Sequence, residues 1–125
     1  MVVTIFGASG RTGRWLTRKA LEQNYTVKAL VRNRSRLPVD DQRIELIEGD
    51  VHNPEAVERA VAGSDAILSA LGWTRTSKKD VLSEGAKNII AAARKYNVRR
   101  IIALTGYGVR FPNDPPDSLN KKLLH

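Results

Sequence analysis

The first thirteen residues, MVVTIFGASGRTG, constrain the fold more than any other part of the chain. Residues 2–6 are apolar or β-branched and predict a buried strand. Gly7, Gly10 and Gly13 follow at three-residue spacing, and a helical pattern comes directly after them. A strand that ends in glycines and continues as a helix can hold a pyrophosphate, because the first N–H groups of the helix point at the anion. The alternative is an ordinary glycine-rich turn.

Each glycine has its own expected role. Gly7 permits a tight turn, Gly10 lets the backbone approach a phosphate, and Gly13 lets the helix pack closely on the sheet. The side chains of the same loop are further candidates for binding that phosphate. They are Ser9, Arg11 and Thr12.

Strands and helices alternate along the rest of the chain. Strands are expected at residues 25–31, 44–47, 65–71 and 100–105, and helices at 14–23, from 53–54 to Gly63, and at 80–96. The connection after the second strand has room for only a turn or two of helix. This order predicts an α/β fold, a Rossmann-like doubly wound parallel sheet with strand order 3-2-1-4-5 and helices on both faces. Its ligand crevice is expected at the carboxyl ends of strands 1 and 4.

Several local signals sharpen these elements. Asn53 and Pro54 are a helix start, and Gly63 is a suitable residue just past the helix end. Asn24 and Asn97 are expected to end the other two helices. The apolar face of the last helix is predicted from helical spacing, and its residues are Val81, Leu82, Ala86, Ile89, Ile90 and Ala93.

Composition narrows the class of protein. A chain of 125 residues is one domain, residues 1–125, and 42% hydrophobic residues are ordinary for a globular core. No cysteine is present, and the two histidines are far apart in sequence, so neither a disulfide framework nor a metal site is expected. No apolar run reaches the roughly 18 residues of a membrane span, and no signal peptide is evident, so the expected location is cytoplasmic.

The net charge of +8 indicates an anionic ligand. The basic residues are dispersed in short groups, several of them just after predicted strands. This favours a small phosphate-bearing molecule over a membrane surface or a nucleic acid, because aromatic residues for base stacking are few and are not interleaved with the basic groups. The expected partner is therefore a small-molecule substrate, and the oligomeric state is left open.

The end of the second strand selects the dinucleotide. An acidic residue there would bind the 2′-hydroxyl of the adenosine ribose in NAD. The chain has Arg32 instead, and Arg34 or Arg36 can join it in pairing with a 2′-phosphate. We therefore predict NADP(H) as cofactor, with Arg32 and Arg36 as binding residues. The alternative is that Arg32 is merely exposed.

The remaining candidates follow the other strands. Asp50 is expected to accept a hydrogen bond from the adenine amino group, beside Val51, although a turn residue is the alternative for Asp50. After the fourth strand, Gly72 is expected to let a ribose approach, and Arg75 is expected at the mouth of the crevice. The residues that follow the fifth strand are expected near the nicotinamide. These candidates are Leu71, Gly72, Arg75, Thr105 and Gly106.

Several segments together resemble the NAD(P)H-binding, atypical short-chain dehydrogenase group. They are FGASGRTG, KALVRNRSRLP, IEGDV, DAILSALG and VLSEGAKNIIAAARKYNVRRIIALTG. The branch they resemble is that of the biliverdin reductase B/flavin reductase-like and NmrA-like proteins. The resemblance implies a Rossmann fold, use of NADP(H) and, in the reductase branch, hydride transfer to a flat conjugated acceptor such as a flavin, a tetrapyrrole or a quinone.

The chain departs from that group in two ways. The Tyr-x-x-x-Lys pair of short-chain dehydrogenases is absent, and Gly106 stands where the flavin reductase-like branch has a serine, so no catalytic residue is assigned. Family members are also longer, so a C-terminal portion that carries much of the substrate pocket is expected to be missing. Two hypotheses follow: an NADPH-dependent reductase, or a sensor that binds NADP(H) without turnover, as NmrA-like proteins do.

Overall fold

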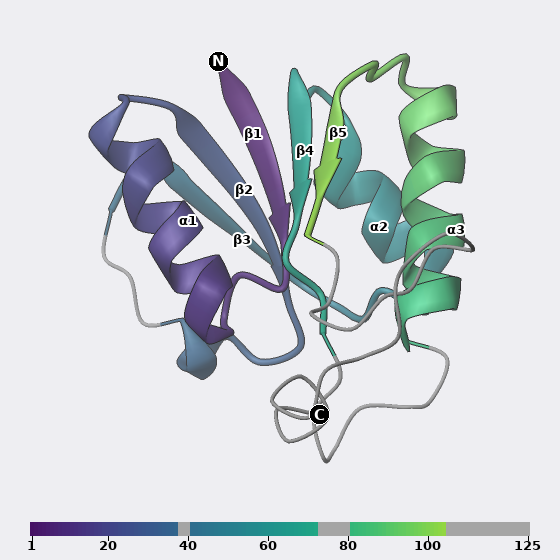
Figure 1. Ribbon diagram of the computed structural model, residues 1–125, viewed down its shortest axis with the longest axis horizontal. Helices are drawn as coiled ribbons and strands as arrows, with labels where there is room; N and C mark the ends of the chain where they lie inside the picture. The colour runs from purple at the N-terminus through teal and green to yellow at the C-terminus, as the bar shows by residue number, and fades with distance from the viewer. Residues whose placement is uncertain (38–40, 73–80, 105–125) are drawn as a thin grey trace, which may run out of the picture.

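A computed structural model describes residues 1–37, 41–72 and 81–104 of the chain. Five parallel strands form one sheet in the order β3-β2-β1-β4-β5 (Figure 1). Their bounds are Val2–Phe6 for β1, Thr26–Val31 for β2, Ile44–Glu48 for β3, Ala66–Ser69 for β4 and Ile101–Ala103 for β5. The predicted fold class and strand order are therefore confirmed.

Helices lie against both faces of this sheet (Figure 1). Their bounds are Arg11–Glu22 for α1, Arg34–Arg36 for the 3-10 helix η1, Pro54–Val61 for α2 and Val81–Lys95 for α3. The single turn of η1 is the helix in the connection between β2 and β3, which agrees with the short connection predicted there. No helix among the described residues is long and apolar enough to cross a membrane.

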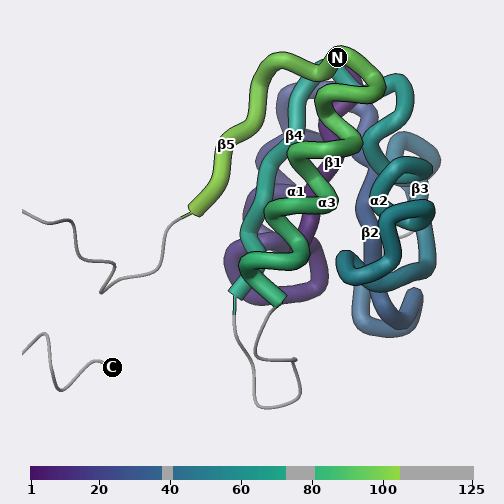
Figure 2. The backbone as a smooth tube through the Cα atoms, turned by 90° about the vertical axis from the view of Figure 1, so that its right-hand side faces the viewer, coloured from purple at the N-terminus to yellow at the C-terminus, as the bar shows by residue number. Residues whose placement is uncertain are grey.

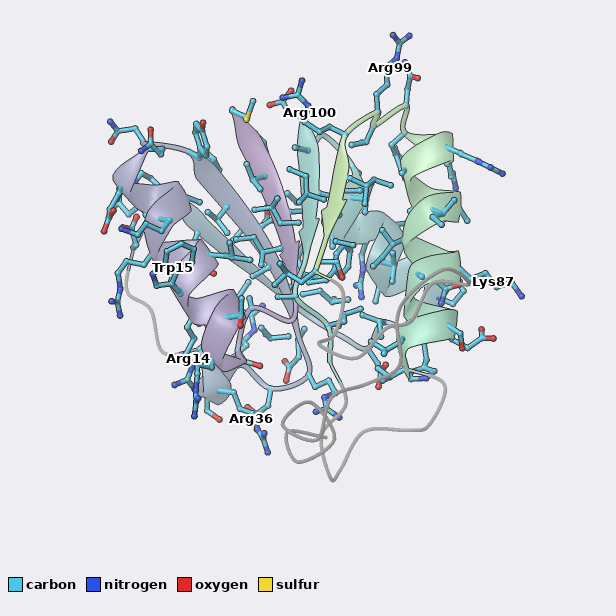
Figure 3. The ribbon with its side chains drawn as sticks, in the orientation of Figure 1. Arg14, Trp15, Arg36, Lys87, Arg99 and Arg100 are labelled. Carbon is cyan, nitrogen blue, oxygen red and sulfur yellow. The ribbon has the colours of Figure 1, made fainter. Side chains whose placement is uncertain are left out.

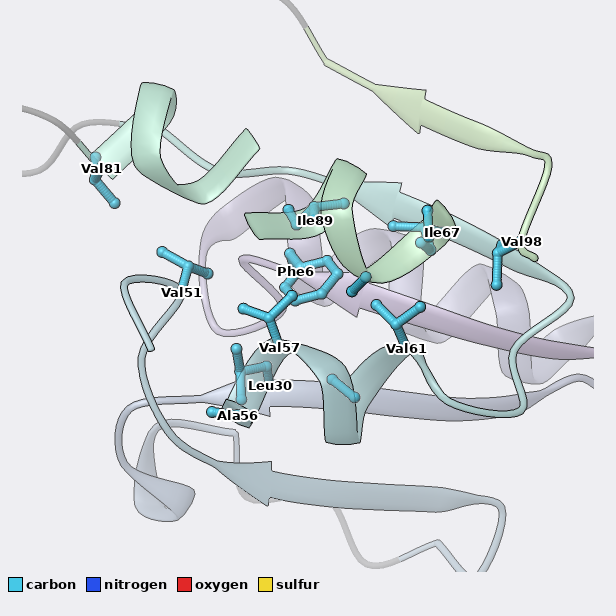
Figure 4. Close-up of a cluster of buried hydrophobic side chains, with 13 residues drawn as sticks. Phe6, Leu30, Val51, Ala56, Val57, Val61, Ile67, Val81, Ile89 and Val98 are labelled. Atoms are coloured by element: carbon cyan, nitrogen blue, oxygen red, sulfur yellow. The ribbon is translucent and has the colours of Figure 1, made fainter. Parts of the chain in front are cut away.

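The central strand β1 feeds two separate cores because its side chains alternate between the faces. Val3 and Ile5 join the cluster beneath α1. Phe6 joins the cluster beneath α2 and α3, where Val57 and Ile67 are also fully buried (Figure 4). Thr4 lies on that second face as well, and its buried hydroxyl donates to the carbonyl oxygen of Ala60 at 2.6 Å.

The predicted roles of three asparagines at helix termini are confirmed. The Asn53 side chain accepts from the N–H of Glu55 at 3.0 Å, with Pro54 in the first turn of α2. Asn24 and Asn97 adopt left-handed backbone conformations, with φ of 61° and 58°, just past α1 and α3. Asparagine tolerates this conformation and so closes a helix where glycine is absent.

Basic side chains of the sheet region close the carboxyl ends of two helices. The Lys28 ammonium donates to the carbonyl oxygens of Arg59 at 2.9 Å and Ala62 at 2.7 Å, at the end of α2. The Arg43 guanidinium donates to the carbonyl oxygen of Leu21 at 2.8 Å, in the last turn of α1. Cations are favourable there because the last carbonyl groups lack partners within the helix. Part of the basic excess therefore has a structural role.

The first helix begins earlier than predicted. α1 starts at Arg11 rather than at residue 14, so Gly13 lies inside the helix instead of before it. The prediction placed all three glycines in the loop. A β-carbon on Gly13 would lie 1.9 Å from the carbonyl oxygen of Gly7, so glycine is needed there for close packing of the helix on the strand end.

The predicted apolar face of α3 is wrong in part. Val81, Ile89 and Ala93 are buried, but Leu82 and Ile90 are 40% and 45% exposed, and Ala86 is exposed as well. The helix is rotated so that Gly85 and Ala92 face inward instead. A β-carbon on Gly85 would lie 3.1 Å from Leu71 and 3.4 Å from Val51, so a small residue lets the helix approach the ends of two loops.

The last strand is a short apolar edge. β5 covers Ile101–Ala103 within the predicted 100–105, and Thr105 lies outside the described residues. Ile101, Ile102 and Leu104 are 39%, 53% and 50% exposed. Figure 2 shows β5 at the margin of the described part of the molecule.

Candidate functional site

A cavity of about 390 Å³ opens at the carboxyl ends of the central strands. The loops after β1, β2, β3 and β4 all contribute to its wall. This is the position predicted for the ligand crevice, where the order of a doubly wound sheet reverses direction.

Most of the sequence-predicted site residues line this one cavity. They are Gly7, Ser9, Gly10, Arg11, Thr12, Arg32, Arg36, Asp50, Val51, Leu71 and Gly72. Gly13 is not among the lining residues; it is buried in the first turn of α1, where it allows close packing on the end of β1. Arg75, Thr105 and Gly106 lie outside the described residues.

The glycine loop is shaped by contacts that exclude side chains. Gly7 has a φ of +76°, which is the left-handed region that glycine occupies at no steric cost. A β-carbon there would also lie 2.7 Å from the backbone carbonyl of Ala70. The chain thus turns sharply where β1 ends, against the end of β4, and the tight turn predicted at Gly7 is confirmed.

The residues at the start of α1 line the cavity, and their N–H groups have no partner within the helix. Gly10 is the N-cap residue, has no side chain to cap the helix, and the first turn carries no acidic residue. The N–H of Arg14 donates to the carbonyl oxygen of Gly10 at 2.9 Å, so the N–H groups of Arg11 and Thr12 precede the helical ladder. By contrast, α2 has both a capping Asn53 and the acidic Glu55 in its first turn.

Three arginines are among the residues that line the cavity. Arg32 follows β2 directly, Arg36 belongs to η1, and Arg11 stands at the start of α1. Asp50 is the one carboxylate among the described residues that line the cavity. An anion in this cavity meets three guanidinium groups together with the positive end of a helix dipole.

Asp50 and His52 form a linked pair at the end of β3. Asp50 Oδ1 accepts from the His52 N–H at 2.9 Å and lies 2.7 Å from His52 Nδ1. Partial burial opposes ionisation of Asp50. The hydrogen bonds from His52 and the positive charges of His52 and Arg32 outweigh it, so the pKa of Asp50 falls below its ordinary value. The carboxylate is therefore held ionised and oriented.

The loop that carries Val51 is held by the neighbouring helix. The side-chain amide of Asn88, on α3, donates to the carbonyl oxygen of Val51 at 2.7 Å. Val51 and Leu71 both pack over Gly85 of the same helix and both line the cavity. The apolar floor of the cavity thus depends on α3 as well as on the strands.

Sequence reasoning missed several lining residues. They are Leu30, Val31, His52 and Val81. His52 carries the clearest overlooked signal, because an aspartate commonly binds the backbone N–H two residues further on, which brings that residue beside it. Val81 was assigned only to a helix face, since nothing in the sequence shows that the first turn of α3 reaches the cavity.

The comparisons with known proteins agree with this geometry. A family model described as NAD(P)H-binding matches residues 7–125. The chain belongs to this family. The predicted family is thereby confirmed, and its flavin reductase-like branch stays a prediction.

Curated relatives carry several kinds of name. The chain is 34% identical, over 83% of its length and 30% of the relative's, to a mitochondrial NADH-ubiquinone oxidoreductase 40 kDa subunit of Neurospora crassa. It is 28% identical to cinnamoyl-CoA reductase 1 of Petunia hybrida, over 94% of the chain and 39% of the relative. It is 31% identical to the photosystem II assembly factor Ycf39 of Cyanophora paradoxa, over 82% and 33%. The chain thus spans well under half of these relatives.

Solved structures show the same architecture. The oxidoreductase ylbE of Lactococcus lactis superimposes with a TM-score of 0.79 at 26% identity, over 99% of this chain and 56% of that one. A short-chain dehydrogenase/reductase of Veillonella parvula, solved in complex with NADP, superimposes with a TM-score of 0.68 at 26% identity, over 82% and 46%.

Proposed function

We propose that the cavity binds NADP(H), in preference to NAD(H). The observation that carries this proposal is the uncapped start of α1, which opens into the same cavity as Arg11, Arg32 and Arg36. The N–H groups after Gly10 bind the pyrophosphate, and the arginines bind the 2′-phosphate. The cavity also offers space next to backbone, since a β-carbon on Gly10 would meet nothing closer than 3.5 Å.

The other lining residues receive the rest of the dinucleotide. Asp50 accepts the adenine amino group through Oδ2, since both bonds from His52 go to Oδ1. Val51 and Leu71 supply apolar contact, and Gly72 leaves room for a ribose, because a β-carbon there would meet no atom of the described residues within 4 Å. Arg75, Thr105 and Gly106 remain candidates for the nicotinamide end on the sequence alone.

We further propose that the protein is an NADPH-dependent reductase whose acceptor is a flat conjugated molecule such as a flavin, a tetrapyrrole or a quinone. NADPH would supply the hydride. The chain contributes by holding the cofactor at its pyrophosphate, its 2′-phosphate and its adenine, and so fixes the orientation of the cofactor. The reductase names among the relatives support this proposal, although their activities belong to proteins more than twice as long.

Cofactor titration tests the binding proposal directly. Isothermal calorimetry with the 125-residue chain should give a smaller Kd for NADPH than for NADH, and Arg32→Glu should weaken NADPH binding by about a hundredfold. Equal affinities in the unmodified chain would contradict the assignment of Arg32. Oxidation of NADPH at 340 nm, with a flavin or a quinone as acceptor and the full-length protein, tests turnover.

Binding without turnover is the second candidate function. It is favoured by relatives named as an oxidoreductase subunit and an assembly factor. A full-length protein that binds NADPH tightly but oxidises it no faster than the buffer does, with all three acceptor classes, would support this function over the reductase.

A further inference from the structure

Arg14 lies beside the cavity rather than in its wall. It is absent from the lining residues and instead borders a shallow surface depression, next to Trp15 on the exposed side of α1. Its guanidinium Nη2 donates to the carbonyl oxygen of Arg36 at 2.8 Å, across 22 positions of sequence. Figure 3 shows Arg14 and Arg36 near the same end of α1.

The turn that Arg14 reaches is weak by itself. η1 is a single 3-10 turn of exposed residues, and one turn does not persist without tertiary contacts. Asn33 closes its start by accepting from the N–H of Ser35 at 3.0 Å, and the buried Leu37 anchors its end in the core beneath α1. Arg14 adds a charged hydrogen bond to the last residue of the turn, as Lys28 and Arg43 do for α2 and α1.

We propose that Arg14 is a positioning residue that determines preference for NADPH over NADH. The inference rests on the proposed NADP(H) site. The pyrophosphate and the 2′-phosphate belong to one ligand, so the start of α1 and the arginines after β2 must stand at a set separation. The bond from Arg14 joins these two parts of the site. Preorganisation of this kind lowers the cost of binding, and NADH, which has no 2′-phosphate, gains little from it.

Calorimetric titration of NADPH and NADH against Arg14→Ala tests the proposal. The Kd for NADPH should rise about tenfold, which is the loss of one charge-assisted hydrogen bond, while the Kd for NADH changes less than about twofold. This rise in the Kd for NADPH should persist in 0.5 M salt, because salt does not screen the effect of losing a structural hydrogen bond to a neutral carbonyl group. Arg14→Lys, which keeps a donor and the charge, should recover part of the preference.

Two matched variants separate positioning from other causes. Arg18→Ala removes an exposed arginine from the same helix, one turn further on, and should leave both affinities within about twofold. Asn88→Ala frees Val51 on the adenine side and should weaken NADPH and NADH alike. Equal losses for both cofactors in Arg14→Ala, no loss at all, or the same loss in Arg18→Ala would overturn the proposal. Absence of NADPH preference in the unmodified chain would instead remove the proposed function.

Discussion

The two edges of the sheet are built from different interactions. Around β2 and β3, long basic side chains bridge elements: Lys28 reaches α2, Arg43 reaches α1, and the exposed Arg34 pairs with Glu48 at 3.7 Å. At the other edge, β5 pairs with β4 through its backbone and presents half-exposed aliphatic side chains. The polar edge supplies Arg32 and Arg36 of the candidate site. The apolar edge is a surface suited to burial.

This difference changes how the net charge of +8 is interpreted. The sequence indicates an anionic ligand for the basic residues as a group. In the structure some of them, Lys28 and Arg43 among them, satisfy carbonyl groups at helix ends, while Arg11, Arg32 and Arg36 face the cavity. Net charge alone therefore overstates the part of the basic surface that is available to a ligand.

The largest effect is expected where the first turn of α1 packs against the end of β1. Gly13→Ala places a β-carbon 1.9 Å from a backbone oxygen and should lower the free energy of unfolding by about 3 kcal/mol or more. Gly10→Ala is the matched control, because its β-carbon meets nothing within 3.4 Å. Urea denaturation of both variants measures this, and a similar loss in Gly10→Ala would contradict the packing argument. Weaker NADPH binding with a loss of stability of at most about 1 kcal/mol, since alanine is a poorer N-cap residue than glycine, is the result expected for Gly10→Ala.

A second pair compares the centre of the sheet with its apolar edge. Ile67→Ala, in a fully buried position of β4, should cost about 3 kcal/mol, whereas Ile102→Ala, at a position 53% exposed on β5, should cost less than about 1 kcal/mol. Thermal and urea unfolding measure both. A cost above 2 kcal/mol for Ile102→Ala would show that the β5 edge is covered in the protein that was measured.

Loss of the hydrogen bonds from Lys28 to the end of α2 should lower the free energy of unfolding by a smaller amount. Lys28→Met removes the donor to the carbonyl oxygens of Arg59 and Ala62 but keeps the length of the side chain, and should cost about 1 kcal/mol. Lys87→Met, at an exposed position of α3, is the control and should stay within about 0.5 kcal/mol. Equal costs in urea denaturation would mean that the bond to α2 contributes nothing.

The smallest effect concerns pH. Because the pKa of Asp50 is lowered in the folded chain, its carboxylate contributes stability above its ordinary pKa of 3.8, and this contribution is lost as pH falls through the lowered value. The stability difference between the unmodified chain and Asp50→Asn should therefore be constant above about pH 5 and shrink below about pH 4. Unfolding curves from pH 2 to pH 5 measure it. A difference that grows on acidification would reverse the assigned sign.

Local signals in the sequence determined the order of elements, the strand order and most of the wall of the candidate site. They sufficed because glycine spacing, Asn-Pro capping and apolar runs act over a few residues, and because parallel strands bring their carboxyl ends together. Arg32 and Asp50 could be located for this reason. Each directly follows a strand whose end the sequence marks.

Only the tertiary structure decided which apolar residues of α3 are buried and which basic residues bind backbone. Both the predicted apolar face of α3 and the face that is buried have helical spacing. The buried face includes Gly85 because Val51 and Leu71 pack against that residue. The bonds from Arg14 to Arg36 and from Asn88 to Val51 span 22 and 37 positions. The residues next to Arg14 and Asn88 in the sequence do not indicate such partners, because the partner depends on how whole elements pack.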